Sequence, residues 1–153
     1  MDRIKIYKVD TFTSNLFSGN PAAVCPLEHW LPDEVMQSIS YENNLSETAF
    51  FIKENNKFYI RWFTPEVEIE LCGHATLAAA HVIFIEMGFK GNNIEFNTIT
   101  GDILKVVRNE SVFTMNFPSH EPKKSKQNLL EITNALGACP ELFLFCNYGF
   151  AVF

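Results

Sequence analysis

The segment 63–88, FTPEVEIELCGHATLAAAHVIFIEMG, constrains the fold of this chain more than any other part of its sequence. It runs from a strand-like stretch through Cys72-Gly73-His74 into a helix built almost entirely from small and apolar residues. A helix that is apolar on every face has to be buried on every face. The unpaired N–H groups of its first turn and the positive end of its dipole favour a bound anion. The segment therefore predicts a wrapped central helix that begins at an anion-binding site.

Length and charge narrow the kinds of protein and partner to consider. The 153 residues fit one ordinary domain, and a hydrophobic content of 47% with 15 phenylalanines indicates a folded globular protein. The net charge is −6 without a long basic run, so we expect no nucleic-acid partner and no binding to anionic membrane surfaces. The longest nearly uncharged apolar run, residues 75–85, is too short to cross a bilayer.

The N-terminus and the cysteines indicate the cellular compartment. The opening sequence, MDRIKIYKVD, is typical of a strand and lacks the apolar region of an export signal. The four cysteines, at positions 25, 72, 139 and 146, include no CxxC pair and no metal-ligand spacing. We therefore expect a reduced, cytoplasmic protein with no disulfide framework and no bound metal.

The patterns along the chain predict an α+β fold with a mixed or antiparallel sheet. A helix is expected to begin at Pro32, because proline and acidic residues suit a first turn. Its inward face should consist of Val35, Met36 and Ile39. Alternation of apolar and polar residues predicts the strands, and those after the central helix form an antiparallel meander. The expected strands are 4–11, 22–25, 48–53, 57–63, 94–99, 103–108 and 112–117.

Two turn signals accompany these elements. Asn55-Asn56 suits a tight hairpin between the strands at 48–53 and 57–63, because asparagine tolerates a positive φ. Gly137 is expected to stop a short helix at 128–136, because glycine readily adopts the left-handed conformation that ends many helices.

The expected domain boundary lies near residue 118. Residues 1–118 form one domain, and residues 119–153 are expected to hold a linker, the short helix and a terminal strand that leads to an absent second domain. The terminal stretch at 142–153, LFLFCNYGFAVF, would promote aggregation if it were an unpaired strand. A partner or further sequence is expected to cover it. The alternative is the buried last strand of a complete small domain.

Three groups of residues are candidates for chemistry. The backbone N–H groups of Gly73 and His74, with the His74 ring, can bind a substrate carboxylate, and the alternative is a plain strand-to-helix turn. Glu47 lies beside apolar residues at the mouth of a strand and can shuttle a proton, and the alternative is a solvated surface glutamate. Cys72 precedes the helix start, where the dipole favours a thiolate base, and the alternative is a buried small hydrophobe.

Four sequence blocks occur together around these residues. They are TFT at 11–13 with FSGNPAAV at 17–24, NLSETAF at 44–50, RWFTP at 61–65 and LCGHATLA at 71–78. Their content, order and spacing resemble the phenazine-biosynthesis PhzF-like isomerase family, which is related to diaminopimelate epimerase and proline racemase. The resemblance extends from Ile4 to about Pro118 and is weak after that.

The resemblance implies a fold of two similar halves, each a barrel-like sheet wrapped around a central helix, with the active site between them. It implies that Glu47 is the acid/base that moves a proton on a carbon next to an activating group. Gly73 and His74 would help to bind the substrate carboxylate, with Asn20 and Ser46 near the site. No metal, nicotinamide or pyridoxal cofactor is implied.

Two features depart from the family pattern. No second glycine-led apolar helix follows Gly88, so the chain resembles the N-terminal half alone. The aspartate that faces the first acid/base in the family would belong to the absent half. Cys72 also occupies the place where epimerase relatives carry a catalytic thiol, whose partner thiol would again lie in that half.

Three hypotheses about function follow. The leading one is a PhzF-like isomerase that acts on a small carboxylate-bearing metabolite by cofactor-free acid/base catalysis, with the 153 residues alone inactive. The second is a non-catalytic, ligand-binding or dimerising half-domain, in which two chains cover each other's apolar surfaces. The third keeps catalysis but assigns it to Cys72.

Overall fold

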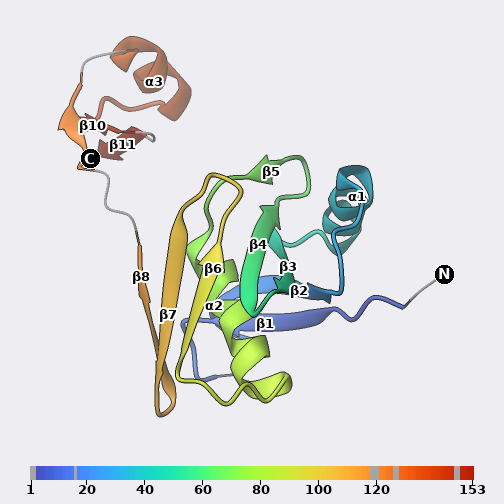
Figure 1. Ribbon diagram of the computed structural model, residues 1–153. Coiled ribbons are helices and arrows are strands. Elements are labelled where there is room, and N and C mark those ends of the chain that lie inside the picture. The colour runs from blue at the N-terminus through green and yellow to red at the C-terminus, as the bar shows by residue number, and fades with distance from the viewer. Residues whose placement is uncertain (1–2, 16, 118–120, 126–127, 147–148) are drawn as a thin grey trace. The chain divides into compact units, whose positions relative to one another are not determined.

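The computed structural model of the chain describes residues 3–15, 17–117, 121–125, 128–146 and 149–153 (Figure 1). The chain divides into two compact units, Met1–Phe117 and Pro118–Phe153. The larger unit holds an eight-stranded sheet in the order β1-β2-β3-β4-β6-β7-β8, with β5 paired to β4. The smaller unit holds a three-stranded sheet in the order β11-β10-β9.

The larger unit is an α+β structure with a mostly antiparallel sheet. Its helical segments are α1 (Asp33–Asn43), α2 (Gly73–His81) and the π-helix η1 (Val82–Glu86), which continues α2. Its strands are β1 (Tyr7–Thr11), β2 (Asn20–Leu27), β3 (Glu47–Glu54), β4 (Lys57–Phe63), β5 (Glu68–Ile69), β6 (Asn93–Asn97), β7 (Ile103–Asn109) and β8 (Val112–Asn116).

Two parallel pairs interrupt the antiparallel order. β2 pairs with β3 and β4 pairs with β6 in parallel, and each pair is joined by a connection that contains a helix, as parallel strands require. α1 forms the first connection, and α2 with η1 lies in the second. β6, β7 and β8 pair antiparallel in sequence order, which confirms the predicted meander.

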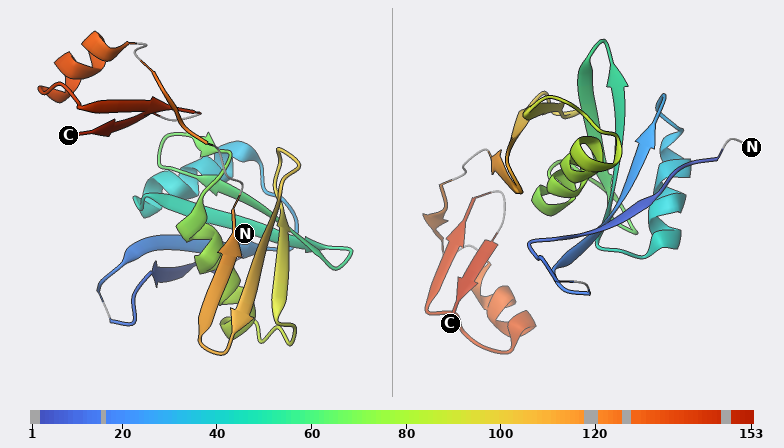
Figure 2. Two further views of the ribbon diagram at one scale, coloured as in Figure 1. Left: turned by 90° about the vertical axis from the view of Figure 1, so that its left-hand side faces the viewer. Right: turned by 90° about the horizontal axis from the view of Figure 1, so that it is seen from below.

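Helix α2 contributes several buried residues to the core of the larger unit. This helix contacts β1, β2 and β3, and Figure 2 (right) shows it flanked by β1–β4 on one side and β6–β8 on the other. Ala75, Ala78, Ala79 and Ala80 are fully buried, because their short side chains let the strands approach the helix closely. Burial continues into η1 as far as Phe84, but Ile85 and Met87 are exposed, so the expectation of a helix buried on every face through this segment is wrong there.

The predicted helix at Pro32 is present, but one of its three inward residues is not buried. Met36 is fully buried against Cys25, Phe50 and Phe63, and Ile39 packs beside them. Val35 is 42% exposed, which corrects its predicted place on the inward face. An eleven-residue helix that packs against β3 and β4 on one side and faces water on the other has a narrow buried stripe, and Val35 lies outside it.

Turn chemistry was the most reliable local signal. Asn55 and Asn56 have φ angles of 49° and 62°, which confirms the predicted hairpin between β3 and β4. In the smaller unit, the helix α3 (Leu129–Leu136) ends at Gly137, whose φ of 73° confirms the predicted stop. In both places the sequence carries a residue suited to the left-handed region.

The terminal segment differs from its prediction. Residues 142–153 form two strands, β10 (Leu142–Phe145) and β11 (Gly149–Val152), which pair antiparallel, instead of one long strand. A short strand, β9 (Lys123–Lys124), lies within the predicted linker and pairs with β10. The apolar terminal strand is therefore paired within its own unit. Within the described residues, no helix has the length and apolar character needed to traverse a bilayer.

Gly19 gives a first testable prediction, on stability. Its φ is 92°, and a Cβ placed there would overlap the carbonyl oxygen of Thr11 and lie 2.7 Å from Thr13 Cγ2. Gly19→Ala should therefore lower the free energy of unfolding by about 1–3 kcal/mol, measured by urea denaturation. Gly101→Ala is the matched control, because Gly101 has a φ of 89° but no atom within 4 Å of the added Cβ. Equal losses for the two variants would contradict a role for the clash.

Candidate functional site

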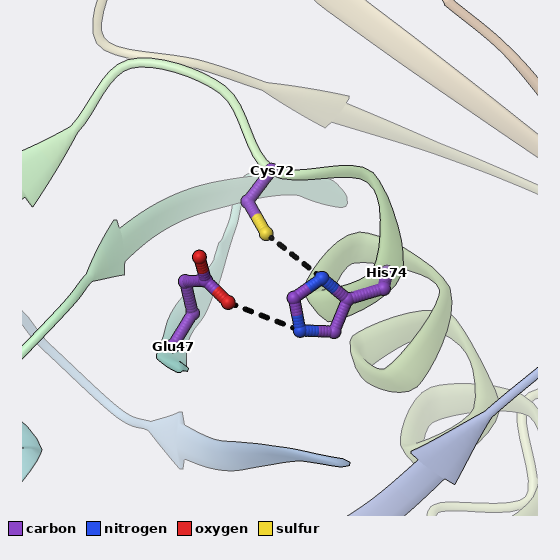
Figure 3. Close-up of side chains that lie close together, drawn as sticks. All are labelled: Glu47, Cys72 and His74. Carbon is purple, nitrogen blue, oxygen red and sulfur yellow. Dashed lines mark hydrogen bonds and ion pairs between the residues drawn. The ribbon is translucent and has the colours of Figure 1, made fainter. Parts of the chain in front are cut away.

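Glu47, Cys72 and His74 meet where two elements, β3 and α2, begin. Glu47 is the first residue of β3, and Cys72 is the N-cap of α2, of which His74 is the second residue (Figure 3). The parallel pairing of β2 with β3 places Glu47 opposite Ala22. Because α2 packs against β2 and β3, the beginning of this helix lies beside the beginning of β3. Residues 25 positions apart in the sequence thus form one cluster.

The His74 ring bridges the other two side chains. Its Nε2 lies 3.1 Å from Glu47 Oε2, and its Nδ1 lies 3.4 Å from Cys72 Sγ (Figure 3). The side chains of His74 and Glu47 are 10% and 18% exposed, and Cys72 is 7% exposed. The cluster is therefore shielded from most water, which strengthens the electrostatic interactions between its members.

The carboxylate of Glu47 is only partly satisfied. Its Oε2 is a buried atom without a hydrogen-bond partner of good geometry among the described residues, although the ring of His74 is within ion-pair distance. A buried polar atom without a hydrogen bond is costly, and such atoms often mark a site that binds another group. The arrangement therefore leaves Glu47 able to accept or give a proton at this oxygen.

Burial raises the pKa of the Cys72 thiol to about 12, because the sulfur is removed from water. The backbone N–H groups of Ala75 and His74 oppose this rise, and the charge of Glu47 adds to it. Desolvation outweighs the helix start here, so Cys72 holds a neutral thiol near neutral pH. This property favours the alternative of a buried small side chain over the proposed thiolate base.

The other residues predicted for the site lie around this cluster. Ser46 Oγ is 3.5 Å from His74 Nε2 and 3.5 Å from the carbonyl oxygen of Pro21. Asn20 is the first residue of β2, next to Pro21, and its carbonyl oxygen accepts a hydrogen bond from Thr11 Oγ1. The structure therefore brings Ser46 to the cluster through its side chain, whereas Asn20 is near through its place in β2.

Gly73 lies beneath side chains that the sequence did not single out. A Cβ at Gly73 would be 3.4 Å from the ring of Phe117 and 3.6 Å from Met115 Cε. These apolar residues cover one side of the start of α2 and make the surroundings of the cluster drier. No local pattern could reveal them, because the contact depends on β8 returning to the start of α2 after a turn and two strands.

The same three side chains offer ligand types that metals use. One atom each from Glu47, Cys72 and His74 could hold a metal ion, since these atoms lie within 4.8 Å of one another. In the observed arrangement the thiol and the carboxylate contact opposite nitrogens of one ring. A single ion bound to either nitrogen would require one of the two partners to move.

Cys72 is expected to resist alkylation in the folded protein. Because the thiolate is the nucleophile, a pKa raised to about 12 lowers the thiolate fraction near neutral pH roughly a thousandfold. Cys139 is exposed and serves as the control within the same chain. Iodoacetamide labelling followed by peptide mass spectrometry should modify Cys139 long before Cys72. Equally fast labelling of both residues would restore the hypothesis of a reactive thiol.

Comparison with known proteins places the chain in a family. The PhzC-PhzF family, described as phenazine biosynthesis-like protein, matches residues 9–141. An uncharacterized isomerase of Pseudomonas aeruginosa is 46% identical over 138 residues, which are 90% of this chain and 52% of that protein. The human phenazine biosynthesis-like domain-containing protein is 41% identical over 124 residues, 76% of this chain and 43% of that protein.

Solved structures give the same result. A PhzF-family protein of Enterococcus faecalis is 43% identical, with a TM-score of 0.82 over 97% of this chain and 56% of that chain. A putative PhzC/PhzF protein of Clostridium difficile is 42% identical, with a TM-score of 0.77 over 94% of this chain and 55% of that chain. The chain spans about half the length of the curated relatives it matches. By sequence and by fold, the chain belongs to the PhzC-PhzF family of phenazine biosynthesis-like proteins.

Proposed function

We propose that this chain provides the N-terminal half of a cytoplasmic, cofactor-independent isomerase, which moves a proton on a carbon acid of a small carboxylate-bearing metabolite. One observation carries the proposal: a largely buried carboxylate, Glu47, contacts the His74 ring at the start of α2 and keeps one oxygen without a hydrogen bond. In such an arrangement the shielded carboxylate can transfer a proton, and the helix N-terminus beside it can stabilise negative charge.

Each residue has a role in this proposal. Glu47 takes a proton from the carbon next to an activating group and returns it at another position. The N–H groups of Gly73 and His74 hold the substrate carboxylate and stabilise the enolate-like charge that develops. Ser46 and Asn20 border the same space. The larger unit is then one barrel-like sheet around α2, and a second half supplies the opposite wall and the facing acid/base.

The proposal is tested with a chimera that joins residues 1–117 to the second half of the Enterococcus faecalis relative, which is similar along the shared length. Proton NMR in deuterium oxide follows the uptake of deuterium by a panel of small amino and unsaturated carboxylates. The unmodified relative identifies accepted substrates, and the chimera should exchange the same ones. The 153 residues alone should give no measurable exchange, because the facing acid/base and the opposite wall of the site would belong to the second half. Robust exchange by these residues alone would contradict the need for a second half.

A second candidate function is a non-catalytic half-domain that dimerises or binds a ligand. It is favoured by exposed apolar side chains in the smaller unit, where Phe145, Phe150 and Val152 are each nearly half exposed. Two chains that cover these side chains would run as a dimer in size-exclusion chromatography with light scattering. A well-behaved monomer at high concentration would argue against this candidate.

A further inference from the structure

The contacts of the His74 ring point to a role for Cys72 that does not require a thiolate. We infer that the Cys72 thiol is a positioning residue, which holds neutral His74 in the tautomer that carries its hydrogen on Nε2. Only the catalytic role of this tautomer rests on the proposed function. The tautomer itself follows from two contacts on opposite sides of the ring (Figure 3).

The first contact is between the thiol and Nδ1. Cys72 Sγ lies 3.4 Å from His74 Nδ1, within hydrogen-bond range for sulfur. The sulfur is buried and its pKa is raised by desolvation, so it keeps its hydrogen. The backbone N–H groups of Ala75 and His74 interact with the sulfur as donors. A neutral thiol has a single S–H to give, and Nδ1 is the acceptor beside it.

The second contact is between the carboxylate and Nε2. Glu47 Oε2 lies 3.1 Å from Nε2, and Ser46 Oγ lies 3.5 Å from the same nitrogen. A carboxylate oxygen has no hydrogen to offer when it is ionised, so a lone pair on Nε2 would repel it. A hydrogen on Nε2 turns this repulsion into attraction. Both contacts therefore select the same tautomer, with Nδ1 as acceptor and Nε2 as donor.

This tautomer gives His74 and Glu47 different roles. With its hydrogen directed at the side of Glu47 and Ser46, Nε2 can donate to a carboxylate but cannot act as a base. Glu47 then remains the group that takes up the proton. Without the thiol, Nδ1 has no donor beside it among the described residues, and the ring is free to exchange its hydrogen between the two nitrogens. Cys72 thus acts through His74 and does not itself need to touch the substrate.

The test is nitrogen-15 NMR of the imidazole rings in the 153-residue chain. Long-range proton–nitrogen spectra, recorded at slightly alkaline pH, distinguish protonated from unprotonated ring nitrogens. The chain has four histidines, and the spectrum of His74→Gln identifies the signals of His74 by their loss. We expect His74 to show a protonated Nε2 and an unprotonated Nδ1. A protonated Nδ1 in the unmodified chain, alone or together with Nε2, would overturn the inference.

Three variants connect the tautomer to the thiol. Cys72→Ala should move both His74 nitrogen signals toward the averaged position of a tautomer mixture. Cys72→Ser should largely restore the original signals, because its hydroxyl also donates. Cys25→Ala is the matched control, since Cys25 is also buried but packs against Met36, Phe50 and Phe63. His74 signals that are unchanged by Cys72→Ala, in a variant whose backbone spectrum shows the native fold, would also overturn the inference.

The two proposals can fail separately. The NMR measurement needs neither a substrate nor the second half, so a missing deuterium exchange in the chimera leaves the tautomer result unaffected. Conversely, a different tautomer would leave the acid/base role of Glu47 intact. If Cys72→Ala does not fold, the spectrum of the unmodified chain still decides the tautomer, and Cys72→Ser decides whether a donor at this position maintains it.

Discussion

Glu47→Gln is expected to lower deuterium exchange by the chimera by about 10²- to 10⁴-fold, the usual contribution of a general acid/base. Glutamine has nearly the same shape as glutamate and can still contact the His74 ring. It cannot, however, take up a proton from a carbon acid near neutral pH. The substitution therefore removes the proposed chemistry while it preserves the size of the buried side chain. The rate is measured by proton NMR with a substrate that the unmodified chimera accepts.

The matched control for this prediction lies on the same strand. Glu54, the last residue of β3, is exposed, and Glu54→Gln should leave the rate unchanged. Circular dichroism and thermal unfolding establish that both variants fold. A Glu47→Gln chimera that retains the full rate would refute the acid/base role. If Cys72→Ser abolished exchange in the same series, catalysis would have to be reassigned to the thiol.

Trp62→Ala is expected to lower the free energy of unfolding by about 3–5 kcal/mol, the typical loss for a large aromatic residue in a core. Trp62 is 1% exposed and belongs to the same buried cluster as the alanines of α2. It lies in the middle of the sheet, paired with Ala49 on β3 and with Ile69 on β5. Truncation would leave a cavity between the sheet and the helix. Urea denaturation followed by far-ultraviolet circular dichroism measures the loss.

Two further substitutions sharpen this prediction. The Nε1 atom of Trp62 is buried without a hydrogen-bond partner among the described residues. Trp62→Phe removes this unsatisfied group and should cost less than about 1.5 kcal/mol, because part of the lost packing is offset. Trp30→Ala is the control, since Trp30 is only partly buried and packs beside the Arg61 guanidinium. A loss for Trp30→Ala as large as that for Trp62→Ala would contradict the argument from burial.

The fold was predictable where the signal is local. Asparagine at 55 and 56 and glycine at 137 identify turns by their own conformational freedom, so the hairpin and the end of α3 followed from sequence alone. The meander followed from alternation of apolar and polar residues. The terminal hairpin did not, because Asn147 and Gly149 are the only turn-favouring residues in the otherwise mainly apolar sequence of 142–153. A continuous apolar run does not reveal where it turns.

The site was predictable only in part. The glycine-led start of α2 marks Gly73 and His74 through a local pattern, and Cys72 is its neighbour. Glu47 has a weaker mark: its place beside apolar residues at the mouth of a strand made it a candidate but left a solvated surface glutamate open, and the family resemblance implied the acid/base role. Its contact with His74 depends on the parallel pairing of β2 with β3, which no short window of sequence specifies. The sequence left Cys72 open between a thiolate base and a buried small side chain, because the desolvation that raises the pKa of its thiol depends on the packing of the whole unit.

All members of the Glu47 cluster lie within Met1–Phe117, so the proposed proton carrier and the ring and thiol beside it belong to one stretch of chain. Such a unit could be retained in evolution while it is combined with different second halves. During evolution, the protein surface that faces the Glu47 cluster could change and so accept another substrate, while the cluster itself was retained. Diversification of specificity in this family would then require change mainly on the opposing surface.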